Sequence, residues 1–212
     1  MKNKTYLVIG TVALLLGAFL LGFKIYKDQE KERLSFISQK DFATFVRDHS
    51  AKKGPEKPQV YLVEFLDPEC ESCRQFHSVV DKLLEDYKDK VQFVVRYAPF
   101  HGNSIFAIKI LEAARKQNKY WETLDILFRR QPEWGGHHAP RPELIWDYLP
   151  EVGLNVDQIK QDLNDIATDE LIKQDQLDGQ ILNVRGTPTF FVNGKASELG
   201  YEELKGAIEA EL

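Results

Sequence analysis

The stretch Asp67-Pro68-Glu69-Cys70-Glu71-Ser72-Cys73 decides both the fold and the chemistry of this chain. It holds the only two cysteines of the 212 residues, spaced Cys-x-x-Cys. The apolar run from Val60 to Leu66 is typical of a strand, and the stretch from Arg74 to Tyr87 is typical of an amphipathic helix. Cys70 is therefore expected at a helix N-terminus, where unpaired N–H groups and the helix dipole stabilise a thiolate. Cys73 follows about one helical turn later and can reach Cys70, so the pair predicts a redox-active dithiol.

A Cys-x-x-Cys pair also occurs in metal sites and structural bridges. A structural zinc site normally needs four ligands, and the chain has no second cysteine pair. His77 leaves open a site made with Cys70 and Cys73, although a helical surface residue is the simpler interpretation of His77. A bridge across so short a loop would restrict the unfolded chain little and add little stability. We therefore expect no metal at this position.

One apolar run is long enough to cross a membrane. Residues 6–23 carry no charge and are flanked on both sides by lysines. A run of about 18 or more such residues is typical of a membrane-spanning helix, and this one lacks the small-residue cleavage site of a signal peptide. We predict an uncleaved anchor, with a cleaved signal as the alternative. Charge does not decide the orientation, but a short basic tip before an apolar segment resembles a signal-anchor, which would leave the rest of the chain outside the cytoplasm.

The rest of the chain is acidic. Residues 1–33 hold six Lys or Arg and three Asp or Glu, which leaves 22 of the 28 basic and 30 of the 33 acidic residues for residues 34–212. Nucleic-acid binding requires a basic surface, so we expect no nucleic-acid partner. About 155 residues after a linker are enough for one domain with its own core. Two cysteines are too few to cross-link a domain of this size, so the domain depends on its hydrophobic core for stability.

The remaining pattern alternates between strands and helices. A second apolar strand over residues 91–97 follows the helix, and this order predicts parallel strands joined by a right-handed crossover. We also expect a short helix over residues 41–48, capped by Ser38. The late part of the chain predicts a strand over residues 189–192, a turn at Asn193-Gly194 and a closing helix over residues 201–212. Between them, helical patterns cover residues 105–117, 119–128, 142–148 and 156–163, and a further helix begins at Thr168.

Two more positions are unusual beside the cysteines. Glu64 lies inside the first apolar strand, six residues before Cys70. A buried carboxylate is costly unless it is paired, protonated or functional, and a strand-edge side chain in water is the alternative. Pro188 cannot donate within a sheet, so it must stand at the start of the late strand. Its peptide bond can be cis, as about 5–6% of such bonds are, but an ordinary trans turn proline is the simpler interpretation from the sequence alone.

Together these residues resemble the thioredoxin superfamily and, within it, the bacterial DsbA-type thiol–disulfide oxidoreductases. The resemblance covers about residues 59–212, from the dithiol through a helical insertion to Thr187-Pro188, which stands where the family has a cis-proline loop facing the cysteines. It implies an α/β, thioredoxin-like fold with an inserted helical subdomain, preceded by an N-terminal transmembrane helix. The expected segments are an anchor over 1–25, a linker and N-terminal helix over 26–58, a thioredoxin-like domain over 59–103 and 184–212, and the helical subdomain over 104–183.

The resemblance also implies a role for each site residue. Cys70 would form the mixed disulfide with a substrate, and Cys73 would resolve it. Thr187 and Pro188 would shape the substrate-binding edge beside the sulfurs. Glu64 would help to move the proton of Cys73. No metal or organic cofactor is implied.

The implied enzyme exchanges a disulfide with exported protein substrates, most directly by oxidising them, and a membrane redox partner would reoxidise it. It would be a single-pass protein of the inner (plasma) membrane, held through residues 6–25, with its catalytic domain in the periplasm or at the outer surface. A reductase or isomerase is the alternative, because Thr187 rather than valine precedes Pro188. Glu71-Ser72 stands where DsbA-type oxidants usually carry Pro-His, so we expect a less stabilised thiolate and a milder oxidant.

Two interpretations from other classes stay open. A metal-handling protein, for example for copper, would use Cys70, Cys73 and His77, or the His137-His138 pair in a loop rich in Gly and Pro. A non-enzymatic binding module would have no need of its cysteines. His101, which follows the second strand, receives no assignment.

Overall fold

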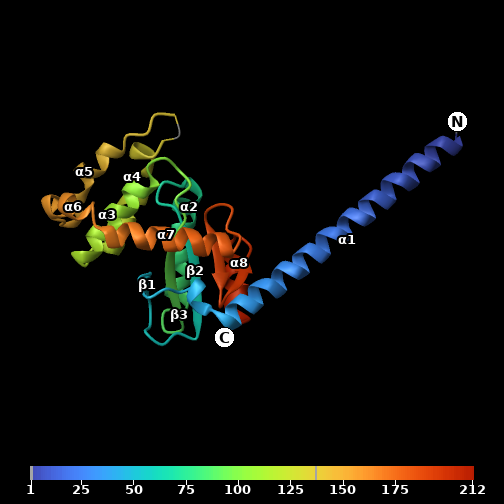
Figure 1. The fold of residues 1–212 in the computed structure, drawn as a ribbon, viewed down its shortest axis with the longest axis horizontal. Coiled ribbons are helices and arrows are strands. Elements are labelled where there is room, and N and C mark those ends of the chain that lie inside the picture. The colour runs from blue at the N-terminus through green and yellow to red at the C-terminus, as the bar shows by residue number, and fades with distance from the viewer. Residues whose placement is uncertain (1, 137) are drawn as a thin grey trace.

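The computed structural model describes residues 2–136 and 138–212, and within them the strands form one five-stranded sheet. The strand order is β1-β3-β2-β4-β5, in which β2 and β3 run parallel and the other neighbours run antiparallel. The strands are β1 (Ala51–Lys53), β2 (Val60–Leu66), β3 (Val91–Tyr97), β4 (Thr189–Val192) and β5 (Lys195–Ser197). Figure 1 shows helices packed around this sheet and a long N-terminal helix that extends away from it.

The helices cover both faces of the sheet and form a separate group beyond one end of it (Figure 1). They are α1 (Lys2–Lys40), α2 (Glu71–Asp86), α3 (Ser104–Lys116), α4 (Tyr120–Trp134), α5 (Ile145–Tyr148), α6 (Val156–Asp162), α7 (Ile166–Ile181) and α8 (Tyr201–Glu209). Short 3₁₀ turns are η1 (Phe42–Thr44), η2 (Pro142–Leu144) and η3 (Leu149–Val152).

Strand β2 lies in the middle of the sheet and is buried on both faces. Leu62 and Leu66 point into a core that includes α2, α8 and the helical insertion. Val63 and Phe65 point to the opposite face, into a second core closed by the end of α7 and by Leu34 of α1. A strand covered on both faces requires a nearly continuous apolar run, which is the pattern of residues 60–66.

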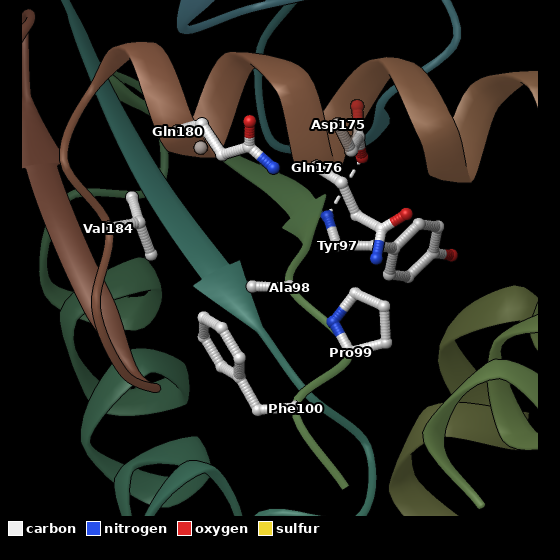
Figure 2. Close-up of a pocket in the computed structure, with 9 residues that line it drawn as sticks. Tyr97, Ala98, Pro99, Phe100, Asp175, Gln176, Gln180 and Val184 are labelled. Atoms are coloured by element: carbon white, nitrogen blue, oxygen red, sulfur yellow. Dashed lines mark hydrogen bonds between the residues drawn. The ribbon is translucent and has the colours of Figure 1, made fainter. Parts of the chain in front are cut away.

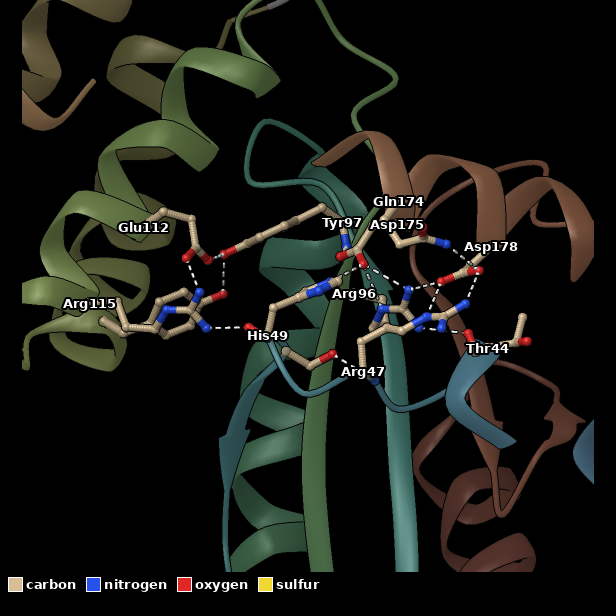
Figure 3. Close-up of polar contacts among 12 residues, drawn as sticks. Thr44, Arg47, His49, Arg96, Tyr97, Glu112, Arg115, Gln174, Asp175 and Asp178 are labelled. Carbon is tan, nitrogen blue, oxygen red and sulfur yellow. Dashed lines mark hydrogen bonds and ion pairs between the residues drawn. The ribbon is translucent and has the colours of Figure 1, made fainter. Parts of the chain in front are cut away.

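A buried polar network fixes α7 against β3 (Figure 3). The guanidinium of Arg96, on β3, is fully buried and donates to Asp175 at 2.8 Å and to Asp178 at 2.5 Å, both on α7. Arg47 makes two further bonds to Asp178, at 2.8 and 2.7 Å. Tyr97 donates its backbone N–H to Asp175 at 2.8 Å. Because each buried charge has partners, the network holds α7 in one register on the sheet.

The predicted α/β fold is confirmed, and the predicted bounds of β2, β3 and β4 match the structure residue for residue. Asn193 and Gly194 form the predicted hairpin turn, with φ angles of 46° and 81° that a type I′ turn requires. Asn155 caps α6, since its side chain accepts from the N–H of Gln158.

Several predicted elements were wrong in extent. The helix expected over residues 41–48 is only the turn η1, because α1 runs on through Ser38 to Lys40 and the chain then bends at Asp41. The bend lets Phe45 pack edge-on against Phe191 at 5.2 Å between ring centroids. Helix α4 continues past Phe128 to Trp134, and α7 begins at Ile166 rather than at Thr168. Strand β1 lies in the segment expected to be linker.

By length and composition, α1 is suited to cross a membrane from Ile9 onward, and its apolar stretch is wholly exposed. Its C-terminal part packs on the domain through buried Leu34, and Arg33 donates to the carbonyl of Ile181 at 2.6 Å. The helix is continuous across the predicted boundary between residues 25 and 26. The division of the chain into four segments therefore stays a prediction.

Candidate active site

The first cysteine stands where a turn joins β2 to α2. Asp67 accepts the backbone N–H of Cys70 at 3.0 Å, which closes the turn, and α2 then begins at Glu71 with Cys70 as its N-cap. The helix is held in place because it buries an apolar face against the sheet. That face consists of Cys73, Val80, Leu83 and Leu84. The sequence therefore places one cysteine at the exposed end of α2 and the other on its buried side.

The two thiols differ in exposure and in acidity. Cys70 is 7% exposed and Cys73 is 0% exposed. Hydrogen bonding from Cys73, with further bonds from Thr187 and from the backbone of Ser72, outweighs burial and lowers the pKa of Cys70 to about 5. Burial, the hydrogen bond to Cys70 and the charge of Glu64 raise the pKa of Cys73 far above its ordinary value. At neutral pH, Cys70 is a thiolate and Cys73 a thiol that donates to it.

The late loop brings Thr187 to the same sulfur. The thiol form of Cys70 donates to the carbonyl oxygen of Thr187 at 3.3 Å. The Thr187–Pro188 peptide bond is cis, unlike the trans bond that the sequence alone favoured, and Pro188 precedes β4 as predicted. The structure thus brings the Thr187-Pro188 loop beside Cys70 and Cys73, although that loop follows the cysteines by more than 110 residues in sequence.

Glu64 lies on the β2 face that is covered by α2. It is 2% exposed, and its Oε1 has no hydrogen-bond partner. Burial, and then the charge of Cys70, raise the pKa of Glu64 well above its usual range. The alternative interpretation of Glu64, as a residue at a strand edge with its side chain in water, is wrong. The pKa of Glu64 is therefore raised in the same site where the charge of its ionised form helps to raise the pKa of Cys73.

A protein-family model described as thioredoxin matches residues 47–210. The chain belongs to this family. The predicted thioredoxin-like fold is thereby confirmed, and similarity to BdbD and to a disulfide bond formation protein D confirms the resemblance to DsbA-type oxidoreductases.

Among solved structures of this family, the chain is similar to oxidised BdbD from Bacillus subtilis. The two are 27% identical with a TM-score of 0.69, over 76% of this chain and 92% of that chain. The chain is also 28% identical to the probable disulfide bond formation protein D of Bacillus cereus, over 100% of this chain and 99% of that protein.

A different kind of relative is the Na⁺/H⁺ antiporter NhaA of Herminiimonas arsenicoxydans. It is 30% identical over 92% of this chain, but the chain spans only 31% of the length of that antiporter. The likeness therefore concerns one part of the antiporter.

His77, the possible third metal ligand beside Cys70 and Cys73, is engaged by other residues. Its ring bonds Asp125 of α4 at 2.8 Å and packs on Phe128. In residues 2–136 and 138–212, no three His, Cys, Asp or Glu side chains converge as metal ligands would. His137 of the predicted His137-His138 pair lies outside the described residues.

Sequence reasoning missed the side chains that hold the cysteine turn. Gln131 of α4 donates to the carbonyls of Pro68 at 2.8 Å and Cys70 at 3.0 Å. Asp67 and Glu69 are buried and accept bonds from the loop between β3 and α3. The only sequence signal for these contacts was that two carboxylates, Asp67 and Glu69, stand just before Cys70, where their negative charge would oppose a thiolate.

A small cavity lies between that loop and α7 (Figure 2). Its volume is about 90 Å³, and its walls include Phe100 from the loop and Val184 from the segment that leads to Thr187. Phe100 is exposed at its rim. The loop that bonds the cysteine turn and the segment that leads to Thr187 therefore both line this hollow.

Proposed function

We propose that this chain is a thiol–disulfide oxidoreductase that exchanges a Cys70–Cys73 disulfide with exported protein substrates, and that it oxidises them. The observation that carries the proposal is the contrast between two sulfurs in one site. Cys70 is the more acidic and the more accessible sulfur, while Cys73 is buried and protonated. An exchange enzyme needs one sulfur as entry point and leaving group and another as resolving thiol.

In the oxidising direction, a substrate thiolate attacks Cys70 of the disulfide. The bond between Cys70 and Cys73 breaks, a mixed disulfide forms, and Cys73 leaves with the electron pair and takes up a proton. A second substrate thiolate then attacks the substrate sulfur of the mixed disulfide, and Cys70 leaves as a thiolate. The substrate has lost two electrons to the enzyme dithiol. Reoxidation by a membrane redox partner closes the cycle.

Two neighbouring groups support these steps. Glu64 is suited to supply and remove the proton of Cys73, because burial raises its pKa well above its usual range. The Thr187 backbone beside Cys70 is suited to bind an extended substrate segment by strand addition. Helix α1, which is long and apolar enough to span a membrane, would anchor the enzyme with its domain on the outer side.

Trapping tests the proposal. In a Cys73→Ala chain Cys70 has no partner sulfur that can displace a bound substrate, so cells expressing it should accumulate disulfide-linked complexes through Cys70, which mass spectrometry identifies. The matched control is Cys70→Ala, which retains Cys73 and should trap nothing. Equal yields from both variants, or none from either under oxidising conditions, would rule out the proposed roles. The compartment of the trapped proteins also reports which side of the membrane the domain occupies.

The redox direction needs its own measurement. The alternative of a reductase or isomerase makes a different prediction for the resting state of the cysteines. An oxidase should be held mostly as the disulfide in the cell, whereas a reductase or isomerase should be held mostly as the dithiol. Acid quenching followed by thiol alkylation distinguishes the two.

A further inference from the structure

The loop between β3 and α3 is bound to the cysteine turn by two buried carboxylates. Asp67 is 0% exposed, and its Oδ2 accepts the backbone N–H of Phe100 at 2.8 Å and of His101 at 3.2 Å. Glu69 is 5% exposed and accepts the backbone and side-chain N–H groups of Asn103 at 2.6 and 2.7 Å. Since buried carboxylates persist only with such partners, the loop and the turn form one unit.

His101 places an imidazole on this unit. Its Nδ1 lies 2.8 Å from Oδ2 of Asp67, and its side chain is 28% exposed. The backbone carbonyl of the same Asp67 accepts the N–H of Cys70 at 3.0 Å. A single buried residue therefore ties the ring to the turn that presents the reactive sulfur.

The groups around His101 are acidic. The groups acting on His101 are Asp67 and Glu69 of the turn and Cys70 at the start of α2. Cys70 in turn adjoins Cys73 of α2 and Glu64 of β2. Burial would lower the pKa of His101, but the hydrogen bond and charge of Asp67, with the charges of Cys70 and Glu69, raise it. The ring thus keeps its proton to higher pH than an isolated histidine.

We propose that His101, held by Asp67, is a positioning residue that supplies the Cys70 thiolate with the positive charge that Glu71-Ser72 lacks. The proposal deepens the oxidoreductase function proposed above and rests on it for its purpose. When the bond from substrate sulfur to Cys70 breaks, Cys70 takes the electron pair and leaves as an anion. The imidazolium stabilises that anion without contributing an atom to the reaction.

The test measures the proton affinity of Cys70 in the reduced full chain in detergent, with no client protein present. The rate of iodoacetamide alkylation is followed against pH, and the labelled peptide is assigned by mass spectrometry. His101→Gln keeps a donor for Asp67 and loses the charge, whereas His101→Lys keeps the charge. His77→Gln is the matched control, because His77 also bonds a carboxylate, that of Asp125.

The His101→Gln change should raise the proton affinity of Cys70 by about threefold to tenfold, as expected for a partly exposed cation nearby. His101→Lys and His77→Gln should leave it within about twofold, well below that effect. The proposal would be overturned if Cys70 of His101→Gln were alkylated with the same pH midpoint as in the wild type. It would also be overturned if the His101→Gln and His101→Lys variants shifted that midpoint equally.

A second measurement needs no substitution at residue 101. Coupling between two titrating groups is mutual, so the Cys70 thiolate must raise the proton affinity of His101 by the same factor. Histidine ring NMR on the full chain should show His101 binding its proton about threefold to tenfold more tightly in the reduced than in the oxidised protein. Equal affinities in both redox states would contradict the proposal. Neither measurement uses a substrate, so failure of trapping would count against the function alone.

Discussion

Replacing Glu64 by Gln should change how stability depends on pH. Glu64 is buried, and its folded-state pKa is raised well above the ordinary value of 4.5, whereas in the unfolded chain it is an ordinary acid. Between these two values the folded protein binds one more proton than the unfolded chain. The free energy of unfolding therefore falls as pH rises, by about 1.4 kcal/mol per pH unit. Gln cannot titrate and removes this dependence.

The magnitude follows from the linkage relation. At the full linkage slope, ionisation of Glu64 in the unfolded chain lowers the free energy of unfolding of the wild type by at most about 2.5 kcal/mol between pH 5 and pH 7. The Gln amide also meets a site where Oε1 has no partner, a penalty of about 1–3 kcal/mol that does not depend on pH. The informative quantity is therefore the difference between the two pH values, about 2.5 kcal/mol in favour of Gln at pH 7.

Denaturant titration of the reduced chain at pH 5 and pH 7 measures this difference. Tryptophan fluorescence is a suitable probe because the three tryptophans, Trp121, Trp134 and Trp146, lie in α4 and α5. Glu85→Gln, at an exposed position of α2, is the control and should show no such difference. If Glu64→Gln and the wild type lose stability equally between pH 5 and pH 7, then Glu64 is ionised in the fold and its role as a neutral proton carrier is refuted.

Three further predictions concern the site and its support. Thr187→Val keeps the volume but removes the hydroxyl that helps to lower the pKa of Cys70, so that pKa should rise by about half a unit to one unit; no change in thiolate absorbance against pH would contradict this. Asp178→Asn leaves Arg96 and Arg47 short of a buried partner and should cost about 3–5 kcal/mol in chemical denaturation; a loss below about 1 kcal/mol would show that the network is not needed. Equilibration with glutathione should give a potential less oxidising than about −120 mV, the DsbA value, and a more oxidising one would contradict the argument from Glu71-Ser72.

The central elements were predictable because their signals are local. Strands β2, β3 and β4 are short apolar runs bounded by turn residues, and the covering helices repeat apolar residues every three or four positions. The order of dithiol, helical insertion and Thr187-Pro188 then led to the thioredoxin fold. Cys70, Cys73 and the proline loop could be named because their chemistry is specific to the residue type.

What could not be predicted depends on contacts between distant segments. Asp67 and His101 are 34 residues apart, and only the folded loop brings them to 2.8 Å. Strand β1 has three residues, two of them lysines, and it exists because the edge of β3 offers partners. The cis bond before Pro188 leaves no trace in composition. The bend that ends α1 depends on the packing of Phe45 against Phe191 in the second core.

The most direct test of the central claim is the pH profile of alkylation at each cysteine of the reduced wild-type chain, read separately by mass spectrometry. The account predicts that Cys70 labels with a midpoint near its pKa of about 5, while buried Cys73 stays unlabelled in the folded protein. Labelling of Cys70 with the midpoint of an ordinary thiol, about 8.5, or labelling of Cys73 ahead of Cys70, would contradict it.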